Sequence, residues 1–352
     1  MANNAASNST AVVYISYLYL TEFTWAANIL IPSWPAMTLF GFVANITNIL
    51  VFLRIGVNDN VTILLLSLSI SDLMYLTLMT PTVCSYIMLI FAPYWPWPTH
   101  IVIGIELLYW PAITCYDFSA FLSVWLGVTR CACVAMPLQF KSVFTKGRTV
   151  KLVLASFLLA VCLRIPIMTV NRLGWRTDPN TNISYAYVEN HNRRAMTQIN
   201  DILNRNSILY INFIIMIACV SILSFKLYQA SRIRKSYTSA STTQQTSEKP
   251  DRQGLSAKDM HVIRSVVLVG SIFIMSQAPF LLFSTARLIS DKFDILQTDR
   301  NRYLFFTFSI VSLTCSYLNA SVNIFVYYNY NSKYKSELSS MLNKFKKPRT
   351  EI

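Results

Sequence analysis

Charged residues are scarce in this sequence, and their scarcity excludes most soluble folds. Only 13% of the 352 residues are Asp, Glu, Lys or Arg, whereas 54% are hydrophobic. Soluble globular domains carry about 25% charged residues, so this composition is typical of a protein that lies in a membrane. The chain is also too long for a single helical hairpin, and we expect it to cross the bilayer several times.

Histidines and paired cysteines, from which metal centres and disulfide frameworks are built, are nearly missing. The three histidines lie far apart, at 100, 191 and 261, and none of the seven cysteines stands at a paired spacing that holds a metal ion. All seven cysteines fall in or beside apolar runs, which argues against a disulfide-stapled extracellular module. No catalytic constellation is visible, so we expect neither an enzyme nor a resident cofactor.

Lysine and arginine are absent from residues 1 to 53, so there is no basic segment of a cleavable signal peptide. The first apolar span must then act as its own insertion signal. Seven apolar segments are long enough to cross roughly 30 Å of hydrocarbon. They cover residues 29–54, 61–90, 100–132, 149–171, 206–231, 261–289 and 302–328. The sequence therefore predicts an all-α membrane protein, a seven-transmembrane helix bundle.

The basic residues, which give the chain a net charge of +14, gather after the third, fifth and seventh spans. By the positive-inside rule these segments are cytoplasmic and the N-terminus is extracellular, as in a multi-pass protein of the plasma membrane. This topology explains the charge better than a nucleic-acid partner does, because the basic residues do not line one folded face. Asn8 and Asn182 begin sequons on the predicted outer side and are candidate glycosylation sites.

We divide the chain into an extracellular tail (1–28), a seven-helix domain (29–330) and a cytoplasmic C-terminal part (331–352). The polar, low-complexity residues 236–254 within the domain are expected to form a flexible cytoplasmic loop. After the last span, lysines occur at helical spacing among the apolar residues Tyr334, Leu338, Met341, Leu342 and Phe345, which we expect to face the lipid surface. This pattern predicts a short amphipathic cytoplasmic helix on the lipids of an anionic leaflet.

The segment 172–205 is an exception to the charge pattern, because it places arginines on the predicted outer side. They are Arg172, Arg176, Arg193, Arg194 and Arg205. These cations could meet an anionic ligand or only solvate a loop. We favour the solvated loop, since most charges in loops do no more than that.

Polar residues also occur well inside the apolar spans. They include Asp72, Ser119, Asn319 and Asn323. Each needs a partner in the bundle interior, because lipid offers none. A carboxylate among hydroxyl and amide oxygens could hold a sodium ion or a proton, or the group could simply join helices by hydrogen bonds. From the residues alone we favour hydrogen bonds that join the helices over an ion site. In the sixth span, Pro279 removes a backbone hydrogen bond and can bend its helix.

Arg130 is only the second basic residue of the chain, after Arg54, and it stands near the end of a long apolar stretch. A cation at the bilayer centre costs at least about 3 kcal/mol, so Arg130 should lie at the membrane edge or in a wet cavity. It could snorkel to lipid headgroups or serve a function, and the stretch itself leaves both readings open.

The order of these features resembles the rhodopsin-like (class A) family of G-protein-coupled receptors, over about residues 38 to 342. The matching residues are Asn45, Leu66-Ser-Leu-Ser-Ile-Ser-Asp72, Arg130 with Pro137-Leu138, Phe273 with Pro279, and Asn323-Ile-Phe-Val-Tyr327. The amino-acid sequences of several segments are most similar to those of invertebrate chemosensory receptors of the molluscan type, followed by those of peptide receptors.

The resemblance implies roles for these residues. Arg130 would meet a heterotrimeric G protein when the cytoplasmic side opens, and Phe273, Pro279 and Tyr327 would belong to the switch. Asp72, Ser119, Asn319 and Asn323 match the family's sodium pocket, so sodium, as an allosteric modulator, becomes the favoured reading of this group. The implied partners are an extracellular small-molecule or peptide ligand and a G protein, together with arrestin and receptor kinases.

Several positions depart from the family pattern. Thr129 replaces the acid before the arginine, and we expect Asp259, twenty residues before Pro279, to restrain Arg130 instead. Gln277 stands where a tryptophan is usual, and Ile105 occupies a position that normally carries a disulfide cysteine.

The ligand is harder to read from the sequence. Ala112 disfavours a biogenic amine, because amine receptors carry an acid there, and the seventh span lacks the lysine that a retinal Schiff base requires. The side chains that we expect to face an outer ligand cavity are Glu106, Tyr109, Asp117, Gln277 and Arg287. The alternative function is a transporter or channel, which predicts an internal repeat or paired broken helices. The sequence has neither.

Overall fold

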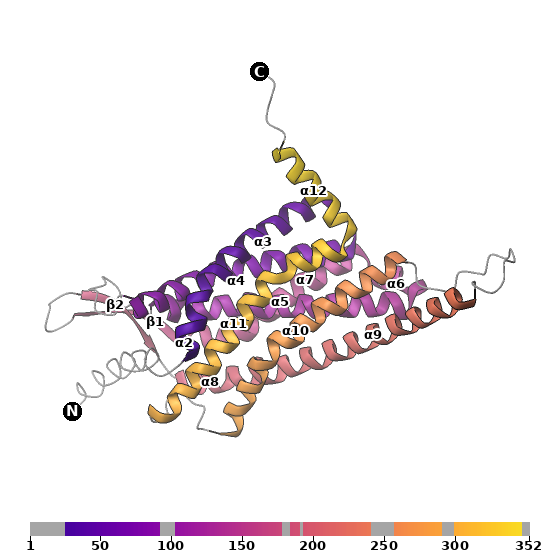
Figure 1. Ribbon diagram of the computed structural model, residues 1–352. Helices are drawn as coiled ribbons and strands as arrows, with labels where there is room; N and C mark the ends of the chain where they lie inside the picture. The colour runs from indigo at the N-terminus through magenta and orange to yellow at the C-terminus, as the bar shows by residue number, and fades with distance from the viewer. Residues whose placement is uncertain are drawn as a thin grey trace, which may run out of the picture.

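The computed structural model describes residues 25–91, 103–177, 184–190, 193–240, 257–290 and 299–346. Its long helices run side by side in one elongated bundle (Figure 1). They are α3 (Trp34–Ile55), α4 (Asn60–Phe91), α5 (Ile103–Ala135), α7 (Lys146–Met168), α9 (Leu209–Ala240), α10 (Ala257–Ile289) and α11 (Asp299–Tyr330). The shorter elements are α2 (Trp25–Leu30), η1 (Ile31–Ser33), α6 (Pro137–Val143), β1 (Asn171–Thr177), β2 (Ser184–Asn190), α8 (Arg193–Asn200), η2 (Asp201–Ile208) and α12 (Ser332–Lys346).

Seven helices of the described chain are long and apolar enough to cross a membrane, which confirms the predicted seven-helix bundle. Their bounds follow the predicted segments closely except in the fifth span. That span runs from Ala195 to Gln229, through α8, η2 and α9, and so begins well before the predicted residue 206. The other end of the same helix also differs from expectation, because α9 continues to Ala240 and residues 236–240 of the expected loop are helical.

A β-hairpin between the fourth and fifth spans lies at one end of the bundle (Figure 1). Strands β1 and β2 pair antiparallel, with Gly174 opposite Tyr187. A Cβ atom at Gly174 would lie 2.9 Å from the Tyr187 ring, so only glycine leaves room for that ring. All seven cysteines are free thiols, and no disulfide ties the hairpin to the helices.

Buried polar side chains join helices that lie far apart in the sequence. The Trp34 indole donates to the Thr314 hydroxyl at 2.9 Å, which links α3 to α11. The Ser71 hydroxyl donates to the Cys115 carbonyl at 2.7 Å, which links α4 to α5. In a membrane little water competes for these groups, so such bonds contribute to helix association beside van der Waals packing.

At the end opposite the hairpin, α12 turns away from the bundle axis (Figure 1). The expected amphipathic helix is present, but its aromatic residue Tyr334 does not face outward. Tyr334 is fully buried between α12 and the bundle, with Phe52 and Tyr327 around its ring. Leu342, two turns further on, is exposed and remains available to a lipid surface.

Candidate functional site

A cavity of about 660 Å³, including the part open to solvent, lies among α5, η2, α9, α10 and α11 in the hairpin half of the bundle. Nine of its 17 lining residues are aromatic or aliphatic and eight are polar or charged, so the cavity can contact both apolar and polar parts of a small molecule. The aromatic lining residues are Tyr109, Tyr116, Phe280 and Phe283, and the polar ones include Asp117, Asn204, Arg205, Gln277, Ser309, Ser312 and Ser316.

An ion pair between α7 and α5 forms one side of the cavity. The Arg164 guanidinium donates from Nε (2.9 Å) and Nη2 (2.5 Å) to Oδ2 of Asp117. Arg164 is only 1% exposed, whereas Asp117 keeps 28% of its side chain exposed toward the cavity. The remaining Arg164 nitrogen donates to the Asn200 amide oxygen at 2.6 Å. The arginine is therefore satisfied, and its charge neutralises that of Asp117.

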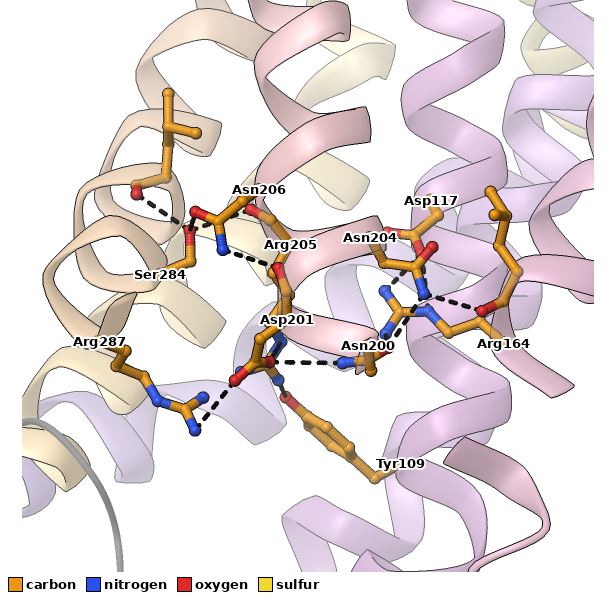
Figure 2. Close-up of polar contacts among 12 residues, drawn as sticks. Tyr109, Asp117, Arg164, Asn200, Asp201, Asn204, Arg205, Asn206, Ser284 and Arg287 are labelled. Carbon is orange, nitrogen blue, oxygen red and sulfur yellow. Dashed lines mark hydrogen bonds and ion pairs between the residues drawn. The ribbon is translucent and has the colours of Figure 1, made fainter. Parts of the chain in front are cut away.

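A second cluster lies around Asp201 at the start of η2 (Figure 2). The Asp201 carboxylate is 3.1 Å from Arg287 Nη2 on α10 and 3.5 Å from Arg205 Nε on the next turn of its own helix. Arg205 also donates to the Tyr109 hydroxyl at 3.3 Å, and its guanidinium lies over the Trp110 and Phe280 rings. One carboxylate thus serves two guanidinium groups.

The backbone of the fifth span explains why so many polar groups meet here. Residues 201–208 form a π-helix, in which the wider turn gathers more side chains on one face than an α-helix does. Asn200, Asp201, Asn204, Arg205 and Asn206 are all buried. Figure 2 shows them turned toward one another and toward Asp117, Arg164, Ser284 and Arg287. Such π segments occur often at functional sites.

The expectation of a solvated loop over 172–205 is wrong for its last third. Arg205 is 7% exposed and lies inside the bundle, while the apolar Ile199, Ile202 and Leu203 point outward. The amphipathic pattern is inverted, because in a membrane the polar face of a helix turns to the protein interior and the apolar face to lipid. On the hairpin, by contrast, Arg172 is exposed, as a solvated arginine would be.

Three of the five side chains that were predicted to face an outer ligand cavity do line it. Tyr109, Asp117 and Gln277 line the cavity. Arg287 lies behind that wall, where it contacts Asp201 and the Phe305 ring. Glu106 belongs to α5, but its side chain is outside the described residues. The sequons at Asn8 and Asn182 also lie outside the described residues.

Asp72 lies at the centre of the bundle and is 0% exposed. Its Oδ1 accepts a hydrogen bond from the Ser119 hydroxyl at 2.6 Å, and its Oδ2 accepts one from the Asn323 amide at 2.9 Å. The structure thus brings together three of the four residues predicted for the sodium pocket. Asn319, the fourth, is buried one helical turn before Asn323.

The chemistry of this group suits a small monovalent cation. Hard cations take oxygen ligands, and the group offers one carboxylate, one hydroxyl and two amides within a water-poor interior. It does not suit a transition metal, because no group of three His, Cys, Asp or Glu side chains that could hold one occurs within the described parts of the chain.

Phe273 and Pro279 lie on α10, on either side of the cavity-lining residue Gln277. Phe273 is buried against Ala120, Val124 and Met216. Pro279 stands inside the continuous helix α10 and cannot donate to the carbonyl one turn before it. The missing bond makes this the turn of α10 at which a bend costs least.

Arg130 lies at the opposite end of α5, which stops at Ala135, and α6 begins at Pro137 after the non-helical Met136. The long helix therefore ends just before Pro137-Leu138, and Arg130 is half-buried at the mouth of the bundle. Thr129 beside it is buried and donates to the Leu126 carbonyl at 3.0 Å. Asp259 is part of α10, but its side chain lies outside the described residues.

The structure combines seven spanning helices, the buried group around Asp72 and an arginine at the end of α5. A comparison with protein families shows which family has this combination. The family described as 7 transmembrane receptor (rhodopsin family) matches residues 44–327. The chain belongs to this family. No curated protein matches the chain.

Membership of the rhodopsin family makes this protein a multi-pass membrane receptor and not an enzyme. The matched region contains both the cavity residues and the Asp72 group, and it ends at Tyr327. Sequence reasoning missed Asn200, Asp201, Asn204 and Arg205 as parts of this rhodopsin-family receptor's interior. A signal was present, since Ile199, Ile202 and Leu203 repeat at helical spacing between them.

Proposed function

We propose that this receptor binds an extracellular ligand in the cavity at the hairpin end and responds by activating a heterotrimeric G protein at the Arg130 end. The ligand would be a chemosensory cue or a neuropeptide. The observation that carries the proposal is the cavity itself, which has a mixed aromatic and polar lining contributed by helices that continue to the opposite end of the bundle.

The receptor would work as a two-state switch. A ligand that contacts α5, α10 and α11 better in one state shifts the equilibrium toward that state. The turn at Pro279 would let the far half of α10 swing away from α5, with Phe273 and Tyr327 repacking as it moves. Agonist and G protein would then strengthen each other's binding by the same factor, as linkage requires.

Asp72, Ser119, Asn319 and Asn323 would hold a sodium ion in the state that does not bind the G protein. The ion would supply a positive charge to the buried Asp72 carboxylate. Loss of the ion or protonation of the carboxylate would accompany activation, so sodium would be a negative allosteric modulator.

The receptor would also contact lipids and other proteins at the two sides of the membrane. The N-terminus and the hairpin would face the outside at the plasma membrane, with Asn8 and Asn182 as glycosylation sites. Arrestin and receptor kinases would act on the cytoplasmic side, where α12 would also contact anionic lipids through its lysines.

A ligand screen tests the proposal. Cells that express the receptor and a G-protein activation reporter are exposed to water-borne odorants and neuropeptides. The proposal expects a response that Arg130→Ala abolishes at equal surface expression. A response that survives Arg130→Ala would contradict the role given to this arginine.

A further inference from the structure

The two charged side chains that line the described cavity differ in how completely they are paired. Among the described residues, only two cavity-lining side chains carry a formal charge, Asp117 and Arg205. Asp117 is already neutralised by two hydrogen bonds from Arg164, a residue that is 1% exposed. An ammonium ligand would therefore find no free carboxylate at Asp117.

Arg205 has weaker compensation than Asp117. Its nearest described carboxylate is Asp201 at 3.5 Å, and Arg287 approaches the same carboxylate more closely, at 3.1 Å. The described cluster contains three guanidinium groups, on Arg164, Arg205 and Arg287, and two carboxylates, on Asp117 and Asp201. Arg205 therefore shares the Asp201 carboxylate with a second guanidinium group.

The hydrogen bonding of Arg205 is also incomplete. The residue is 7% exposed, and its Nε has no hydrogen-bond partner. Apart from the ion pair with Asp201, the described polar contact of the Arg205 side chain is the 3.3 Å bond to the Tyr109 hydroxyl. A buried cation with unused donors is costly unless an anion completes its coordination.

The aromatic rings around Arg205 favour a planar anionic group with an apolar body. Phe280 and Trp110 hold the guanidinium at 5.2 and 5.7 Å from their ring centres, which fixes the orientation of its donor edges. A carboxylate pairs with such a fork through two parallel hydrogen bonds. Tyr116 and Phe283 in the lining provide ring surfaces for the remainder of a ligand.

We propose that the cavity takes a small aromatic carboxylic acid whose carboxylate pairs with Arg205. This inference rests on the proposed ligand-binding function and narrows it, because it excludes cationic amines and neutral apolar ligands as the preferred class.

The test measures binding to the full-length receptor, purified in lipid nanodiscs, without reference to signalling. The probes are arylalkanoates from phenylacetate to 5-phenylvalerate, each with the amide and the amine of the same skeleton, and the readout is the concentration that stabilises the receptor against heat. The wild type should be stabilised by an acid of the series at a concentration more than about tenfold lower than by its amide or amine.

Two variants separate Arg205 from general positive charge. Arg205→Gln should raise the effective acid concentration more than about tenfold, whereas Arg172→Gln, which removes an arginine from the exposed face of β1, should leave it unchanged. Arg205→Lys keeps the charge but loses the fork, and it should bind the acid with intermediate strength. Arg205→Lys also tests the role of the guanidinium group if Arg205→Gln does not fold.

The inference is overturned by stabilisation that is stronger with the amine or amide, by acid binding that survives in Arg205→Gln, or by no acid binding at all. The proposed function fails separately. Arg205-dependent binding of acids without any G-protein response would refute the coupling and keep the ligand class. A G-protein response to cationic ligands that is intact in Arg205→Gln would refute the ligand class and keep the coupling.

Discussion

The Tyr334 hydroxyl on α12 donates a 2.6 Å hydrogen bond to the Asn48 amide oxygen on α3, and both residues are fully buried. The Tyr334 ring lies 5.4 Å from that of Phe52 and 5.7 Å from that of Tyr327, the residue assigned to the switch. Burial raises the pKa of Tyr334, so the hydroxyl keeps its proton and remains a donor. A single polar contact therefore ties the last helix to the first span next to Tyr327.

Tyr334→Phe should lower the free energy of unfolding by about 1–3 kcal/mol, because it leaves the buried Asn48 oxygen without a donor. The Asn48 amide nitrogen already lacks a hydrogen-bond partner, so the asparagine would lose its described contact. Thermal and denaturant unfolding of the purified receptor measure the change. Tyr328→Phe, at a more exposed tyrosine of α11, is the matched control and should have little effect.

The double variant Asn48→Leu with Tyr334→Phe should recover part of the loss, since it removes the unpaired groups on both sides. Equal stability of Tyr334→Phe and the wild type would contradict the assigned hydrogen bond.

Arg164→Met should destabilise the receptor by about 3 kcal/mol, because it leaves the Asp117 carboxylate without its cation. We expect the lower end of the range for broken buried ion pairs, since Asp117 keeps 28% of its side chain exposed toward the cavity. Adding Asp117→Asn should restore much of the stability. The shift in thermal midpoint of the single and double variants measures both effects, and a double variant less stable than Arg164→Met would count against the pairing.

The seven spans and the group around Asp72 could be predicted from the sequence for a physical reason. A membrane span is recognised by its high mean hydropathy. A polar residue at hydrocarbon depth must turn toward the protein interior, because lipid offers it no hydrogen-bond partner. Ser119 and Asn323 do bond to Asp72. Depth alone predicted that these side chains turn inward, whereas their grouping into one pocket came from the resemblance to the receptor family.

The outer half of the fifth span could not be predicted in the same way. Its polar residues lower the mean hydropathy, so that it resembles a loop, and only the partners in the fold reveal it as a buried helix. Arg164 and Asp117 are 47 residues apart in sequence, and Ser284 is 79 residues from the Arg205 carbonyl that it contacts. Tyr334 was expected at the lipid surface for a similar reason, since its partner Asn48 is 286 residues away.

Sodium should stabilise the wild-type receptor and not Asp72→Asn. The proposed ion neutralises the buried Asp72 carboxylate, and an asparagine offers it no charge. Unfolding temperatures are compared in sodium chloride and in N-methylglucamine chloride at the same ionic strength, so that general screening is held constant. Glu189→Gln, at an exposed position of β2, should keep the full sodium effect. An equal sodium response in Asp72→Asn would exclude this site.

Asp259→Ala should raise ligand-independent signalling. The residue before Arg130 is Thr129, which is buried and already donates to the Leu126 carbonyl, so it cannot supply a carboxylate. The acid that restrains Arg130 in the closed state must then come from another helix, and Asp259 on α10 is our candidate. Loss of one stabilising contact of the closed state should raise basal G-protein activation on the order of fivefold.

The measurement is the reporter signal without ligand, normalised to receptor at the cell surface. Glu337→Gln on α12 removes a carboxylate beyond the same end of the bundle and should leave the basal signal unchanged. Adding Arg130→Ala to Asp259→Ala should abolish the increase, because the released arginine is the group that meets the G protein. A basal signal in Asp259→Ala equal to that of the wild type would show that Arg130 is restrained by another group.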